Sequence, residues 1–209
     1  MRKQCSAVLA CCILLTGCGN APAQKTDYTY EELPYGATLA IVQDSLIASQ
    51  YDSRYITEAM RDTVLRYYHA IETKDVDTFV ALQLPQWHDY VNNTVYKGQY
   101  TDLQLIKSTY DTSAKDFGGS FEFSFISIDE AEKCSAGSEG QQVIDVLDEL
   151  AKEQDKEKLS PDIGAMWELS ITAHMAKKGS GTRGETGNVL TDEHLYLLEY
   201  KSEWYIIIS

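Results

Sequence analysis

The sequence predicts a single α+β domain in which helices come first and an antiparallel meander of strands ends the chain. Between residues 56 and 110, apolar side chains recur at steps of three and four, which is the period of a helix lying on a core. From residue 121 onward the period changes to the alternation of half-buried strands. Helices grouped ahead of strands predict that the helices cover one face of the sheet.

The clearest helix begins after Thr57, which belongs to the residue types that cap helix N-termini. Asp75 and Thr101 are candidate caps for two further helices, over residues 76–82 and 103–110. The apolar stripe of the first helix consists of Ile56, Met60, Val64, Tyr67, Tyr68 and Ile71. A fourth helical stripe covers residues 143–150 and runs into a charged, solvated end at 152–158.

Strands are predicted wherever apolar and polar residues alternate. In the first of them Phe121, Phe123 and Phe125 share one face. The predicted strands are residues 121–128, 166–176, 189–200 and 204–208. Residues 39–42 form a short apolar run that is either a strand or an arm packed on the domain, and 51–55 is turn-like.

The N-terminus has the pattern of a secretion signal. Arg2 and Lys3 precede an uncharged apolar run that is far shorter than the ~20 residues of a spanning helix. The run ends in a branched aliphatic residue, small residues and a cysteine, in the order Leu15, Thr16, Gly17 and Cys18. This pattern resembles the lipobox of bacterial lipoproteins, in which the cysteine thiol is acylated and becomes the mature N-terminus. An ordinary cleaved signal peptide is the alternative interpretation.

The resemblance implies three segments. Residues 1–17 are a lipoprotein signal peptide, residues 18–34 a lipidated N-terminus and tether, and residues 35–209 a single α+β domain. Lipid on Cys18 would anchor the chain to the extracytoplasmic face of the cell membrane, because two or three acyl chains bind a bilayer stably.

Charge and cysteine content exclude some classes of function. The chain has 32 acidic and 18 basic residues, so it is a poor partner for nucleic acid. Of the five cysteines, only Cys134 is left once the signal has been cleaved and Cys18 acylated, so the mature chain can form no internal disulfide. No lysine–histidine cluster lies near Cys134 in sequence, and this cysteine is expected to be incidental.

Residues 55–209 resemble the nuclear transport factor 2-like superfamily, whose domains form an α+β cone. The resemblance rests on the end of the first helix at Tyr67–Ile71, the polar step from Lys74 to Asp75, and the closing strand at Trp204, which Lys201 precedes. It implies helices packed on a curved antiparallel sheet. The arm at 30–50 and the acidic helix around 140–158 depart from the minimal pattern.

The chemical motifs are weak. Gly179–Gly184 (G-S-G-T-R-G) matches the dinucleotide fingerprint, but it lacks the strand–helix setting that this motif needs and is interpreted as a hairpin tip. The four histidines show no metal-ligand spacing, and no cofactor or metal site is expected. Each of the three tryptophans is interpreted as core rather than as part of an exposed aromatic face.

Enzymes of the resembled superfamily place titratable pairs inside the cone, where burial tunes their pKa values. The candidates here are Glu168 and His174 on one strand face and Tyr196 on the next strand. Glu168 and His174 lie six residues apart, about 20 Å along a strand, so they are not expected to pair directly. His174 and His194 lie on neighbouring predicted strands and are candidates for a close approach.

Three functions remain. The first is a non-enzymatic, membrane-tethered module that binds a small ligand or an envelope protein. The second is an isomerase, dehydratase or hydrolase that uses a buried histidine or acid. The third is a transporter's solute receptor, for which the chain is short. We expect the first, because the sequence shows no chemical constellation.

Overall fold

The computed structural model describes Thr29 and residues 33–135, 137–153, 156–182, 184 and 188–207. The chain divides into two units at Leu33, and the account below concerns the second, Pro34–Ser209. The signal sequence, Cys18 and nearly all of the predicted tether lie outside the described residues.

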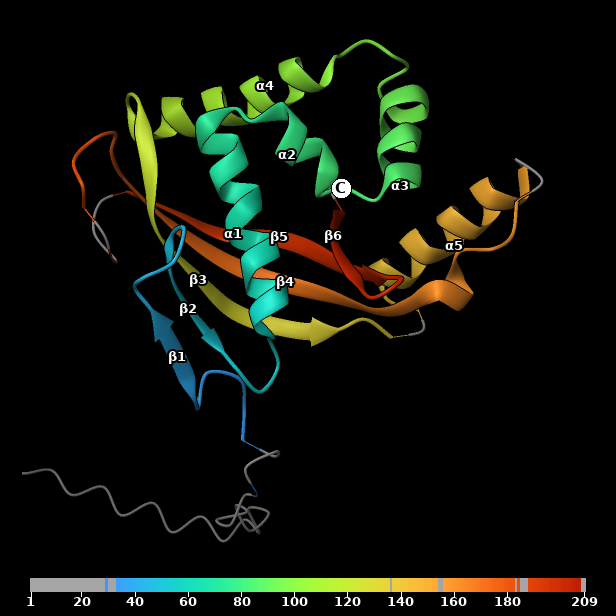
Figure 1. Ribbon diagram of the computed structural model, residues 1–209, viewed down its shortest axis with the longest axis horizontal. Coiled ribbons are helices and arrows are strands. Elements are labelled where there is room, and N and C mark those ends of the chain that lie inside the picture. Colours follow the sequence, from blue (N-terminus) through green and yellow to red (C-terminus); the bar gives the residue numbers. More distant parts are fainter. Residues whose placement is uncertain are drawn as a thin grey trace, which may run out of the picture. The chain divides into compact units, whose positions relative to one another are not determined.

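The second unit is an α+β domain, as the sequence predicts. Its sheet is curved and unclosed, and six strands lie side by side in the order of the chain (Figure 1). The strands are β1 (Leu39–Val42), β2 (Ala48–Asp52), β3 (Phe121–Lys133), β4 (Ile163–Lys177), β5 (Asn188–Tyr200) and β6 (Glu203–Ile207). All neighbours are antiparallel except β2 and β3, which run parallel. Residues 39–42 are therefore a strand, and the predicted turn at 51–55 is wrong at its start, because Tyr51 and Asp52 belong to β2.

Five α-helices accompany the sheet in the described part of the chain. They are α1 (Glu58–Thr73), α2 (Val76–Ala81), α3 (Pro85–Tyr90), α4 (Asp102–Phe117) and α5 (Glu139–Glu153). The three predicted caps are confirmed: Thr57, Asp75 and Thr101 each accept a hydrogen bond from a backbone N–H in the first turn of α1, α2 and α4. Thr101 also forms a reciprocal capping box with Gln104.

Two apolar clusters form on opposite faces of the sheet. Leu195 and Leu197 of β5 belong to a cluster with α1, α2 and α4, while Tyr196 and Leu198 belong to a second cluster with α3 and α5. Because alternate residues of a strand point to opposite faces, the helices cover both faces. The expectation of helices on one face only is therefore wrong. Figure 1 shows α1 lying across the strands and α5 beside the far end of β4.

A β-bulge in β3 overturns one predicted face. The register with β4 shifts between Phe123 and Phe125, so Phe121 and Phe123 face α1, whereas Phe125 points to the other side. There the Phe125 ring meets the ring of His174 edge-on, with centroids 5.7 Å apart. Ile126 and Ile128 take over the inward positions beyond the bulge.

Candidate functional site

A polar groove opens beside the second apolar cluster. Its volume is about 410 Å³, within the range of about 300–1,000 Å³ that is common for small-molecule sites. One wall comes from α3 and from the π-helix η2 (Val91–Val95) that extends it, and the other comes from α5 and the segment after it. The turn between β5 and β6 closes one side of the groove with Tyr200 and Lys201.

The first wall is one face of a continuous helical segment. Its lining residues follow the spacing i, i+3, i+4, i+7 and i+8, which brings side chains together on a helix. They are Gln86, Asp89, Tyr90, Asn93 and Thr94. Pro85 begins the helix at a position where its missing N–H costs nothing, and the buried Trp87 fixes the helix to the sheet through the second cluster.

A neighbouring stripe of the same segment is bound to α4. His88 Nε2 lies 2.9 Å from Asp102 Oδ1, and the Asn92 amide donates to the same oxygen over 3.1 Å. Because a carboxylate oxygen only accepts hydrogen bonds, His88 donates to Asp102 through its Nε2–H. In η2 the Tyr96 N–H bonds to the Val91 carbonyl, five residues back. Single π-turns of this kind are frequent at functional sites.

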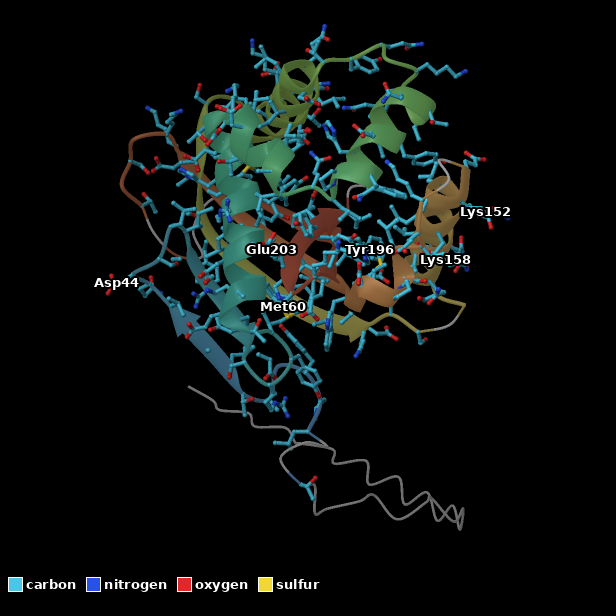
Figure 2. The ribbon with its side chains drawn as sticks, turned by 45° about the vertical axis from the view of Figure 1, so that its right-hand side comes forward. Asp44, Met60, Lys152, Lys158, Tyr196 and Glu203 are labelled. Atoms are coloured by element: carbon cyan, nitrogen blue, oxygen red, sulfur yellow. The ribbon has the colours of Figure 1, made fainter. Side chains whose placement is uncertain are left out.

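The second wall is organised by Asp148 of α5. Its Oδ1 accepts hydrogen bonds of 2.9 Å from the backbone N–H groups of Leu159 and Ser160, and its Oδ2 accepts one of 2.7 Å from the Ser160 hydroxyl. Burial alone would raise the pKa of Asp148, but these hydrogen bonds outweigh it and the pKa is lowered. Lys158 Nζ lies 3.6 Å from the same carboxylate (Figure 2). Residues 152, 153 and 156–158 are exposed, as predicted for a solvated end, and Leu159 and Ser160 directly after them are bonded back to α5.

The β5–β6 turn has both central residues at positive φ, 52° at Lys201 and 67° at Ser202, as in a type I′ hairpin turn. This turn places Lys201 Nζ 3.5 Å from Asp162 Oδ2 and 5.1 Å from the centre of the Tyr200 ring. Three lysines and three acids line the groove: Lys156, Lys158, Lys201, Asp89, Glu157 and Asp162. The groove is thus balanced in charge, although the chain has a net charge of −14.

Two of the three predicted site residues come together, but not inside the space beneath α1. Glu168 and Tyr196 are directly opposite in the β4–β5 register, on the face of the second cluster. The hydroxyl of Tyr196, which is labelled in Figure 2, donates to Glu139 of α5 over 3.1 Å. Burial, followed by this carboxylate, raises the pKa of the phenol. Glu168 Oε1 lies 3.1 Å from Nδ1 of the exposed His194. The alternation of β5 was predicted correctly, but nothing in it says which face meets α1.

His174 lies apart from these residues. It pairs with Val189 in the register, whereas His194 pairs with Ser170, so the two histidines do not approach each other. Its Nδ1 is buried without a hydrogen-bond partner in the described structure. His174 therefore packs against Phe125 and joins no titratable pair that the described residues show.

The face toward α1 carries a different acid, Glu193, which sequence reasoning missed. Glu193 lies opposite Ile171, a residue of the first cluster. Partial desolvation raises the pKa of its carboxyl, although Glu193 as a whole is exposed to solvent. Burial, followed by the charge of Glu193, raises the pKa of Tyr67 on α1. The helical spacing from Gln86 to Thr94 was a second missed signal, because these residues share one face of α3 and η2.

Cys134 packs against the first turn of α5 next to Gly140, and burial raises the pKa of its thiol. A raised pKa leaves less thiolate, which does not favour a role as nucleophile.

Among the residues described, no three histidine, cysteine or acidic side chains are grouped so that they could hold a metal ion. The helices within the same residues are all too short or too polar to cross a bilayer. Comparison with known proteins finds no matching family model, no matching curated protein and no matching solved structure.

Proposed function

We propose that this protein is a lipid-anchored, extracytoplasmic lipoprotein whose folded domain is a non-enzymatic binding module of the cell envelope. The single observation that carries the binding role is the groove between α3–η2 and α5. Its walls are held by internal hydrogen bonds, so the site exists before a ligand arrives and costs little ordering on binding. The anchor rests on the lipobox-like sequence that ends at Cys18. The acidic chain argues against a nucleic-acid partner.

We further propose that the domain is a divergent member of the nuclear transport factor 2-like superfamily. Helices α1 and α2 ahead of a curved sheet, and the closing hairpin of β5 and β6, support this assignment. The β1–β2 hairpin, with its parallel contact to β3, and the helix α5 are additions to the minimal pattern. The second addition supplies one wall of the groove.

An enzyme of the same fold is the second candidate, and Glu193 beside Tyr67 is the observation that favours it. An acid with a raised pKa near a phenol is an arrangement used in proton transfer. However, among the described residues no hydrogen bond or ion pair joins a histidine to Glu193, and His194 is bonded to Glu168 instead. The binding role therefore has the stronger structural support.

The binding role can be tested in intact cells with a photoreactive amino acid in place of Asn93 on the groove wall. The matched control carries the same amino acid at Gln142, which is exposed on α5 and does not line the groove. We expect a cross-linked adduct of reproducible mass at position 93 and none at position 142. Equal labelling at both positions, or none at either, would refute a ligand-binding role for the groove.

A further inference from the structure

The groove contains polar groups that the fold itself does not use. Gln86 Oε1 is buried without a hydrogen-bond partner in the described structure. Asn93 and Thr94 are exposed on the same helical face, and no side-chain hydrogen bond joins either to another described residue. The adjacent residues His88 and Asn92, by contrast, are both bonded to Asp102. An unpaired buried acceptor is costly, so a small rotation of the Gln86 side chain that brings Oε1 to a ligand donor in the groove would be favourable.

Two of the three lysines that line the groove lie close to a carboxylate. Lys201 lies 3.5 Å from Asp162, and Lys158 lies 3.6 Å from Asp148. A strongly charged ligand would have to compete with these carboxylates and ammonium groups, and would also meet a site that has as many lysines as acids. On the wall formed by α3 and η2, Gln86, Asn93 and Thr94 offer neutral hydrogen-bonding groups, namely two amides and a hydroxyl.

Two aromatic rings complete the site. Tyr90 and Tyr200 line the groove and are half-buried, because both also pack against the second apolar cluster. The Tyr90 ring packs against the Trp87 ring, and the two ring centroids lie 5.5 Å apart. The face of an aromatic ring is negative and attracts C–H groups that carry partial positive charge. Sugar rings present such C–H groups on their faces and hydroxyl donors and acceptors on their edges.

We propose that the groove binds a short, uncharged oligosaccharide, which stacks on Tyr90 or Tyr200 and hydrogen-bonds to Gln86, Asn93 and Thr94. This inference rests on the proposed binding function and adds the class of ligand. The unpaired amide acceptor, the neutral hydrogen-bonding groups and the half-exposed phenol rings all match polyhydroxylated rings. The charged ends of a dipeptide, or the charge of a phosphate, would instead have to compete with the Lys201–Asp162 and Lys158–Asp148 contacts.

The test is calorimetric titration of the full-length protein in a detergent that has no sugar head group. The probes are maltotriose, cellotriose and the trimer of N-acetylglucosamine, with diglycine and inorganic phosphate as charged probes. We expect at least one trisaccharide to bind, and Asn93→Ala to weaken that binding about 2- to 10-fold, the equivalent of one lost hydrogen bond. The matched control Gln142→Ala removes an exposed amide from α5 and is expected to leave the affinity unchanged.

The outcomes separate this inference from the proposed function. Binding of diglycine or phosphate that Asn93→Ala weakens, without trisaccharide binding, overturns the oligosaccharide inference and leaves the binding module standing. Trisaccharide binding that both variants leave unchanged overturns the assignment to this groove. If none of the five probes binds, the inference is overturned, and the cross-linking at position 93 decides separately whether the groove has any ligand.

Discussion

Gly140, in the first turn of α5, packs closely against Cys134, which follows β3, and against Met166 of β4. A Cβ added there would clash with the Cys134 side chain, lying 2.9 Å from its Cβ and closer still to its Sγ, and would lie 3.2 Å from Met166 Sδ. Sγ can rotate away, but the Cys134 Cβ can move only with the backbone of the chain after β3. Gly140→Ala must therefore push α5 outward or strain this segment.

The expected cost follows from two opposing effects. Overpacking of a core costs about 1–3 kcal/mol, whereas alanine in place of glycine gains up to about 1 kcal/mol in a helix interior and less in the first turn. The net loss of unfolding free energy is about 1–2 kcal/mol. For a chain of this size each kcal/mol changes Tm by about 2–4 °C, so Tm is expected to fall by about 2–8 °C.

The assay is thermal and urea unfolding of the full-length protein, followed by circular dichroism. Gln142→Ala, an exposed position of the same helix, serves as the control and is expected to change the unfolding free energy by less than about 0.5 kcal/mol. Cys134→Ala removes Sγ and should recover part of the loss in the double variant. An unchanged or raised Tm for Gly140→Ala, or the same loss with and without Cys134→Ala, would show that α5 does not pack as closely as described.

Three further predictions concern other parts of the chain. Asp52 is buried, and hydrogen bonds from Arg54 hold the pKa of the Asp52 carboxyl well below its usual range. Asp52→Asn should lower the free energy of unfolding by about 3 kcal/mol at pH 7. In urea titrations this difference should shrink below about pH 4, because stability from a lowered acid pKa is lost as the pH falls. The pKa of the Glu193 carboxyl is shifted in the opposite direction, so its ionisation opposes folding. Glu193→Gln should raise Tm slightly at pH 7 and leave it unchanged at pH 4, and equal effects at both pH values would contradict the raised pKa of this carboxyl. Cys18→Ala should move the protein from the membrane fraction to the soluble fraction, and unchanged partitioning would rule out the lipid anchor.

Local signals in the sequence predicted the helices well. Thr57, Asp75 and Thr101 cap helices through hydrogen bonds made within one turn, which depend on neighbouring residues alone. The long strands β4 and β5 were also predicted, because alternation over many residues is a strong signal.

Features that depend on distant parts of the chain were missed. The bulge that turns Phe125 away from α1 comes from the pairing of β3 with β4, and no residue type marks it. The face of Tyr196 was not predictable from β5 alone, because alternation is symmetric between the two faces until a helix covers one of them. β2 was hidden because its five residues, Ala48–Asp52, include three polar ones.

The groove could be recognised only in part. The spacing of Gln86, Asp89, Tyr90, Asn93 and Thr94 is visible in the sequence as one helical face. The opposite wall depends on Asp148, which folds the Leu159–Ser160 segment back through hydrogen bonds across more than ten positions of the chain. Such a contact is set by tertiary packing, so sequence reasoning saw only a charged helix end.

The most direct test of the binding module is hydrogen exchange of the full-length protein in detergent, with and without a solubilised envelope fraction from the cells that make it. The account predicts that the fraction slows exchange in residues 86–95 and 156–162, and that Asn93→Ala reduces this protection while the exchange of α4 stays the same. Two results would contradict the assignment of the groove as a binding site. In the first, the fraction leaves hydrogen exchange in both segments unchanged. In the second, the fraction slows exchange but Asn93→Ala leaves this protection intact.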